Sequence, residues 1–179
     1  MGRDKGMMLL KGKPMISHIL EAFNEAEIPV NIIANDSSYE SLRFPVFADI
    51  VSEKGPMGGL LTAIKYSKAE VIFLVSCDMP LISSNALKHF FELGDREHIV
   101  AATVEERVNP LFALYPVCLQ QELEIRIAEG RLKMTDMILE NKHILVPSIA
   151  GENPQLFRNV NNEEDFRILE DNWNHLSKT

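Results

Sequence analysis

Apolar and polar positions along the chain follow two periods. Four apolar residues between positions 16 and 23 recur at the spacing of one helix face, and Pro14 before them suits a first helical position. Short β-branched runs at 30–34 and 46–51 indicate strands. Residues 71–76, VIFLVS, are the clearest buried strand. Strands at 99–104 and 111–115, joined by a charged turn, and a last one at 143–146 complete the set.

Helices are expected between these strands. One begins near Gly59, one is capped by Ser83 or Ser84, two cover about 118–129 and 134–141, and Asn162 with Asp165 caps the last. Alternating strands and helices predict a three-layer α/β fold in a single domain over 1–179, with a mostly parallel sheet and helices on both faces. Sheets of this kind bind ligands beyond the carboxyl ends of their strands.

The composition and net charge of the chain argue against some kinds of binding partner. The chain has 179 residues, 46% of them apolar and 25% charged, with a net charge of -8. This charge argues against nucleic acid as a partner, although a small anionic ligand could bind a local cation cluster. Neither Cys77 nor Cys118 has a zinc-ligand spacing, and no apolar run reaches the length of a membrane span or a signal peptide. We therefore expect a cytoplasmic protein without a membrane partner.

Three segments combine glycine, cations or a carboxylate in ways that suit a nucleotide. Arg3 and Lys5 lie between two glycines, as in a loop that wraps phosphates, although a solvated basic terminus looks the same. The Gly-Pro-Met-Gly-Gly sequence at 55–59 forms either a surface for a base or phosphate, or a simple turn. Asp78 follows the buried strand, where it could anchor Mg²⁺ or cap a turn.

A fourth segment, Asn159-Val160-Asn161, enters the last helix. If it is extended, both asparagines face one side and could contact a ligand or Mg²⁺; an asparagine-rich turn is the other interpretation. The five histidines form no metal-binding pair, and no nucleophile motif of a hydrolase is present. Metallohydrolase and catalytic-triad chemistry therefore have little support.

In this order the segments resemble one family, the molybdenum cofactor guanylyltransferases. The first residues, with Gly12, Pro14 and His18, are similar to the second half of the family's N-terminal signature. Asp49 with Gly-Pro-Met-Gly-Gly, Cys-Asp-Met-Pro at 77–80 and Asn-Val-Asn at 159–161 match three further family motifs. The resemblance covers essentially the whole chain and implies a Rossmann-like nucleotidyltransferase fold.

The resemblance also implies an activity and a role for each candidate residue. Family members transfer GMP from GTP to molybdopterin with Mg²⁺, and molybdoenzymes or their chaperones receive the product. Lys5 and Asp78 would be catalytic, with Lys5 on the triphosphate and Asp78 on the metal. The remaining assignments are nucleotide binding for Arg3, Asn35, Asp49, Gly58 and Gly59, and the molybdopterin side for Asn109, Asn159 and Asn161.

The sequence departs from the family at its start. The family's first strand and its Leu-Ala-Gly-Gly are absent, and Met1 coincides with the methionine inside the signature. A start assigned too far downstream or omitted residues would explain this, and so would a truncated variant; we favour the first two. Two other functions therefore stay open: a nucleotidyltransferase for CTP or a sugar phosphate, and a non-catalytic molybdopterin-binding accessory protein.

Overall fold

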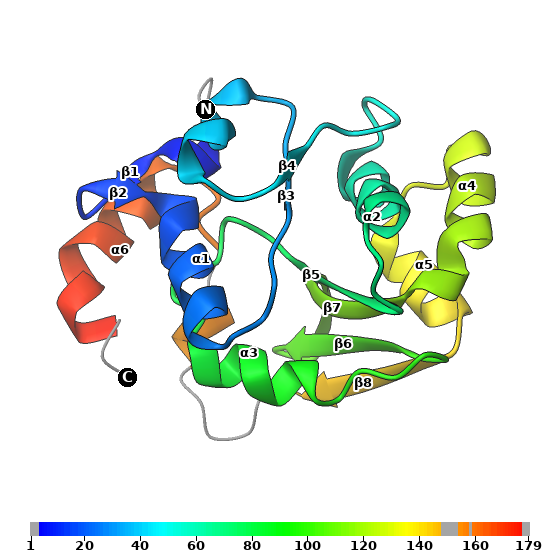
Figure 1. Cartoon of the computed structure of the whole chain (residues 1–179). Coiled ribbons are helices and arrows are strands. Elements are labelled where there is room, and N and C mark those ends of the chain that lie inside the picture. Colours follow the sequence, from blue (N-terminus) through cyan, green and yellow to red (C-terminus); the bar gives the residue numbers. More distant parts are fainter. Residues whose placement is uncertain (1–3, 148–153, 158, 177–179) are drawn as a thin grey trace. The chain divides into compact units, whose positions relative to one another are not determined.

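The computed structural model describes residues 4–147, 154–157 and 159–176 in two compact units (Figure 1). The first unit combines Met1–Val30, Ser76–His89 and Ile149–Thr179, and the second combines Asn31–Val75 and Phe90–Ser148. The single domain expected over 1–179 stays a prediction.

The second unit contains a four-stranded sheet in the order β5-β7-β6-β8. β7 is antiparallel to both β5 and β6, and β8 is parallel to β6. β5, β6 and β8 therefore run in one direction and β7 alone is reversed, close to the mostly parallel sheet expected. The strands are β5 (Val71–Val75), β6 (Ile99–Val104), β7 (Arg107–Pro116) and β8 (His143–Pro147).

Helices cover both faces of this sheet, as expected. Figure 1 shows α2, α4 and α5 on one side, and their buried residues share one core with Ala101 of β6 and with Ala113 and Tyr115 of β7. On the other face, Phe90 at the end of α3 packs against Phe73 and Phe112, with ring centroids 5.5 and 4.8 Å away. The helices are α2 (Gly55–Tyr66), α3 (Ser84–Phe91), α4 (Gln120–Ala128) and α5 (Met134–Glu140).

β5 differs from the expectation of a buried strand at 71–76. All five residues, Val71–Val75, are only partly buried. Among the strands that the structure describes, β5 pairs with β7 alone and lies at one edge of the sheet. The apolar composition was interpreted correctly as a strand, but a free edge leaves part of each side chain accessible.

A second, two-stranded parallel sheet in the same unit pairs β3 (Ile32–Ile33) with β4 (Val46–Phe47). Both strands are shorter than the runs 30–34 and 46–51 predicted. α2 contacts both β3 and β5. One helix therefore packs across the two sheets.

The first unit is built around a small hairpin and two helices. β1 (Leu9–Leu10) pairs antiparallel with β2 (Lys13–Pro14), which leads directly into α1 (Met15–Glu25). Leu10 and Met15 share a core with residues of α6 (Glu163–Leu176), among them Leu169. Asn162 and Asp165 cap α6 reciprocally: Asp165 N donates to Asn162 Oδ1 at 2.8 Å, and Asn162 N to Asp165 Oδ2 at 3.2 Å. This cap confirms the prediction.

Both units also contain short 3₁₀ helices. They are η1 (Lys5–Met7), η2 (Ser37–Leu42), η3 (Val117–Leu119) and η4 (Pro154–Phe157).

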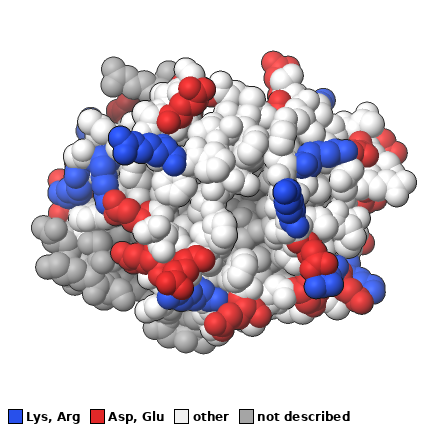
Figure 2. All heavy atoms as spheres, viewed as in Figure 1, with Lys and Arg blue, Asp and Glu red and all other residues white. Residues whose placement is uncertain are grey.

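The surface carries mixed charge. On the face that Figure 2 shows, basic and acidic side chains lie interspersed rather than in large patches of one sign. No helix in the described part of the chain is long and apolar enough to cross a membrane.

Candidate functional site

Asp78 lies in the first unit, in the segment that follows the carboxyl end of β5. Its backbone carbonyl accepts a hydrogen bond from Val160 N at 2.8 Å, which brings the Asn-Val-Asn segment next to it. Asp78 Oδ1 and Asn159 Oδ1 are both buried, and neither has a hydrogen-bond partner among the described residues. Two neighbouring residues thus each present a buried oxygen acceptor without a donor in the part of the chain that the structure describes.

Lys5 opens η1 in the same unit. Asp4 Oδ1 accepts from Gly6 N at 2.9 Å, and this cap fixes the turn that carries Lys5. Gly6 is buried within the turn. Arg3, the other predicted phosphate contact, lies outside the described residues.

The pKa of the Cys77 thiol depends on the charges around this turn. The pKa of its thiol is raised to about 11, mainly by burial and in addition by the negative charges of Asp78 and Asp4, whereas the Lys5 ammonium acts in the opposite direction. The cation and the carboxylate therefore lie within electrostatic reach of the same sulfur. The thiol itself stays protonated at neutral pH, which fits the expectation of a buried, unreactive cysteine.

Asn35 and Asp49 form a pair in the second unit, each two residues beyond a strand. Ile33 pairs with Phe47 in the β3–β4 register. Two residues further along each segment, the same register brings Asn35 opposite Asp49. Asn35 Nδ2 donates to Asp49 Oδ2 at 3.0 Å, and Asp49 N donates to Asn35 Oδ1 at 2.9 Å. Asp49 Oδ1 is buried and has no partner in the described part of the chain.

The glycines at 55–59 form the first turns of α2 and not a loop before it. The predicted start near Gly59 was wrong by about one turn, because Pro56 suits the first helical turn, where its missing N–H is not needed. A Cβ on Gly58 would stand 3.0 Å from Val51 O, whereas one on Gly59 would stand 3.8 Å from Asp49 Oδ1. Gly59 therefore faces the free carboxylate oxygen.

Asn109 and Asn161 have local roles in the structure. Asn109 lies in β7 opposite Ala102, beside a register shift, and its Oδ1 accepts from Leu111 N at 3.1 Å. Asn161 is exposed, and its backbone N–H donates to Asp165 Oδ2 at 3.0 Å. Their predicted place on the molybdopterin side stays a prediction.

The candidate residues thus fall into two groups, one in each unit. Lys5, Asp78 and Asn159 belong to the first unit, and Asn35, Asp49, Gly58 and Gly59 to the second. Sequence reasoning missed Thr62, a fully buried polar residue of α2 that bonds to the segment after Asp49. Its position among Leu60, Leu61 and Ile64, all apolar and buried, was the available signal.

Metal ligands are few in this arrangement. Residues 4–147, 154–157 and 159–176 contain no group of three or more His, Cys, Asp or Glu side chains that could hold a metal ion. One carboxylate and one amide oxygen are nevertheless a donor set that suits Mg²⁺, which keeps water and phosphate oxygens as its remaining ligands.

The fold is that of a class, the nucleotidyltransferases of the Rossmann-like α/β type. Residues 1–144 match the family model described as a MobA-like NTP transferase domain. The chain belongs to this family.

Relatives and solved structures agree with this assignment. A probable molybdenum cofactor guanylyltransferase of Flavobacterium johnsoniae is 30% identical over 94% of this chain and 89% of its own length. Molybdopterin-guanine dinucleotide biosynthesis protein A of Archaeoglobus fulgidus has a similar fold, with a TM-score of 0.82 at 20% identity over 97% of this chain and 92% of that one. A Mycobacterium tuberculosis protein, solved in complex with manganese, has a TM-score of 0.65 at 16% identity over 95% and 93%.

Proposed function

We infer that this chain transfers GMP from GTP to the phosphate of molybdopterin, forming the guanine dinucleotide form of the molybdenum cofactor and pyrophosphate. Family membership and the printed names of the relatives support this reaction. The observation that carries the proposal is the pair of unpartnered buried oxygens on Asp78 and Asn159, in the same unit as the Lys5 turn. Molybdoenzymes or their chaperones would receive the product.

The two oxygens suit a divalent cation. A buried acceptor without a donor is costly, and a bound cation would offset that cost for both groups at once. We assign Mg²⁺ to Asp78 Oδ1 and Asn159 Oδ1, where it would neutralise triphosphate charge. Asn159 was predicted on the molybdopterin side; its free oxygen supports a metal ligand at least as well.

Lys5 would hold the triphosphate from the capped turn. The Asp4 cap orders the backbone on which Lys5 stands, so that its ammonium meets the phosphates without a large loss of freedom. In an in-line displacement at the α-phosphate, the molybdopterin phosphate is already a nucleophile. Positioning and charge neutralisation then suffice, and no activated serine or cysteine is needed.

The second group would hold the guanine nucleoside. Asp49 Oδ1 can accept from an N–H of the base, and Gly59 opposite it has no side chain to obstruct the approach. Asn35 occupies the other carboxylate oxygen and so fixes the orientation of Asp49. A base whose edge carries adjacent N–H donors, as guanine does, fits this acceptor.

Thermal unfolding with Mg²⁺ alone, then with GTP and then with CTP, tests the proposal. A ligand at a hundredfold excess over its Kd stabilises the folded state by about 2.7 kcal/mol, which raises the Tm by several degrees. We expect a shift with GTP and none with CTP. A larger shift with CTP would favour another nucleotidyltransferase of this fold, and no shift with either would contradict nucleotide binding.

Product formation separates an enzyme from an accessory protein. The chain is incubated with molybdopterin, GTP and Mg²⁺, and both pyrophosphate and the dinucleotide product are measured. GMP transfer by this chain would rule out a non-catalytic role. Molybdopterin binding without any transfer would contradict the proposed reaction.

A further inference from the structure

Thr62 is a fully buried polar side chain in α2, whose other buried residues are apolar or glycine. Its hydroxyl accepts a hydrogen bond from Ile50 N at 3.0 Å and donates one to Gly58 O at 2.9 Å. A threonine that bonds the carbonyl four residues earlier is common in helices. The bond from Ile50, twelve residues away in sequence, is not explained by helix geometry.

The two partners of Thr62 are the immediate neighbours of Asp49 and Gly59. Ile50 follows Asp49, and Gly58 precedes Gly59. One hydroxyl therefore joins the segment after β4 to the first turns of α2. Because both bonds are made to backbone atoms, they set the separation of the two segments independently of the side chains at 50 and 58.

Asp49 is held from its other side as well. Asn35 bonds to Asp49 through one carboxylate oxygen and through the backbone N–H, and Oδ1 remains. This free oxygen lies where a Cβ of Gly59 would be 3.8 Å away. Asn35 thus fixes the orientation of the carboxylate, whereas Thr62 fixes its distance from the helix.

We propose that Thr62 is a positioning residue of the nucleotide site, holding Asp49 and the first turns of α2 at the spacing that a guanine base requires. The inference rests on the proposed function, because it assigns the ligand of Asp49 Oδ1 to a base. Thr62 does not touch the nucleotide. Without its hydroxyl, Ile50 N and Gly58 O would lose their shared partner, and the segment that carries Asp49 would move relative to Gly59.

The test compares Thr62→Val, which keeps the shape and removes the hydroxyl, with Thr62→Ser, which keeps the hydroxyl. Binding of GTP and of ITP, which lacks the exocyclic amino group, is measured by calorimetry with Mg²⁺, together with kcat. Thr62→Val should weaken GTP binding about tenfold, bring the affinities for GTP and ITP closer together, and leave kcat at saturating GTP nearly unchanged. Thr62→Ser should restore GTP affinity.

Thr103→Val is the matched control, because Thr103 also bonds a distant backbone carbonyl, that of Val146, in the same unit. It should leave both affinities unchanged. If Thr62→Val keeps wild-type affinity and GTP preference, or loses only stability as the control does, the positioning role is wrong. If the wild-type chain itself binds no GTP, the proposed function fails first, and a base ligand for Asp49 fails with it.

Discussion

The carbonyl oxygen of Asp78 accepts the backbone N–H of Val160 at 2.8 Å. This bond joins the segment after β5 to the segment before α6. The two residues are 82 positions apart in the sequence. The bond sets Asp78 beside Asn159, and each of them contributes a buried oxygen without a donor in the described residues. A backbone contact thus brings together, in one candidate site, two motifs that are distant in sequence.

Replacement of Asp78 by Asn should abolish transfer and leave the Tm nearly unchanged. The substitution keeps the shape of the side chain and removes the charge that a cation needs, so we expect a loss of at least about a hundredfold in kcat/KM. Lys5→Ala should behave in the same way, because its ammonium is proposed to bind the phosphates and does not belong to the apolar core. Activity assays paired with thermal unfolding check both; a large drop in Tm would show that these residues are structural.

Gly59→Ala should separate stability from binding. An added methyl group has room, 3.8 Å from both Asp49 Oδ1 and Ile33 Cγ2, and alanine favours a helix by up to about 1 kcal/mol. The variant should be as stable as the wild type or more so, yet bind GTP about tenfold more weakly, since the methyl group covers the acceptor oxygen.

Gly58→Ala provides the contrast for that experiment. Its Cβ would stand 3.0 Å from Val51 O, a backbone atom that cannot easily move, so we expect a loss of about 1–3 kcal/mol. Unfolding in urea and GTP calorimetry on both variants decide the matter. Full GTP affinity in Gly59→Ala would show that the ligand does not use Asp49 Oδ1.

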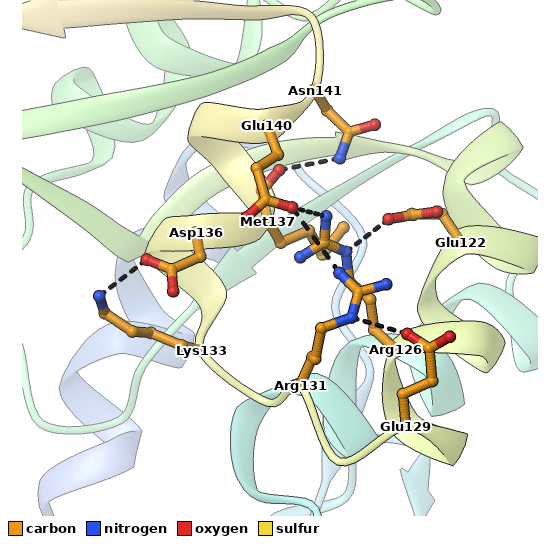
Figure 3. A network of polar contacts seen from close by, with 9 residues as sticks. All are labelled: Glu122, Arg126, Glu129, Arg131, Lys133, Asp136, Met137, Glu140 and Asn141. Carbon is orange, nitrogen blue, oxygen red and sulfur yellow. Dashed lines mark hydrogen bonds and ion pairs between the residues drawn. The ribbon is translucent and has the colours of Figure 1, made fainter.

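Arg126 should be the most sensitive charged residue of the α4–α5 contact in Figure 3. Its side chain is 3% exposed and donates to Glu122 and Glu140, each at 2.6 Å. Arg126→Ala leaves two carboxylates without this partner and an unfilled space, which should cost about 2–4 kcal/mol of unfolding free energy. Urea denaturation measures this loss.

Arg131 offers the matched control within the same network. It bonds to Glu129 at 2.7 Å but is 45% exposed, and exposed ion pairs contribute less than about 1 kcal/mol. Arg131→Ala should therefore change stability little. Equal losses for the two variants would mean that burial of Arg126 contributes nothing.

His18 should make the protein less stable in acid. Burial lowers its pKa below 6.5, and the positive charge of Lys13 acts in the same direction. Together they outweigh the carbonyl of Leu10, which accepts from Nε2 at 3.0 Å, and the negative charge of Glu21. Below 6.5 the unfolded chain therefore binds a proton at this residue before the folded chain does. The stabilising contribution is present above that pH and is lost as the pH falls through the lowered pKa.

Urea midpoints at about pH 7.5 and about pH 5.5 measure this effect in the wild type and in His18→Gln. The variant should lose less stability between the two values. His89→Gln, at an exposed position of α3, should keep the wild-type difference. An unchanged pH dependence in His18→Gln would exclude His18 as the source.

Much of the fold could be predicted from local patterns. Apolar periodicity located the strands and helices, and the reciprocal cap of Asn162 and Asp165 was visible from their spacing. The number of strands that pair with residues 71–75 could not be predicted, because an apolar run has the same composition at the edge of a sheet as in its middle. The edge position and partial burial of these residues were therefore missed.

Lys5 and Asp78 were candidates from residue type alone, as a cation beside a glycine and a carboxylate after a strand. Asp49 became a candidate only through the family resemblance, and the roles of all three stay predictions. Thr62 could not be found in this way, because its importance lies in which backbone atoms its hydroxyl reaches. The start of α2 was predicted too late because the glycines were taken as a loop, although Pro56 is typical of a first helical turn.

The free edge of β5 bears on solubility. Uncharged strands of β-branched and aromatic residues with an open edge tend to stack on identical strands of other molecules. Glu70 directly precedes β5, and its exposed carboxylate forms an ion pair with the exposed side chain of Arg96. A further strand that stacks on this edge would have to remove water from both charges, and that cost opposes aggregation. One surface ion pair at the start of β5 would thus help to keep the protein dispersed.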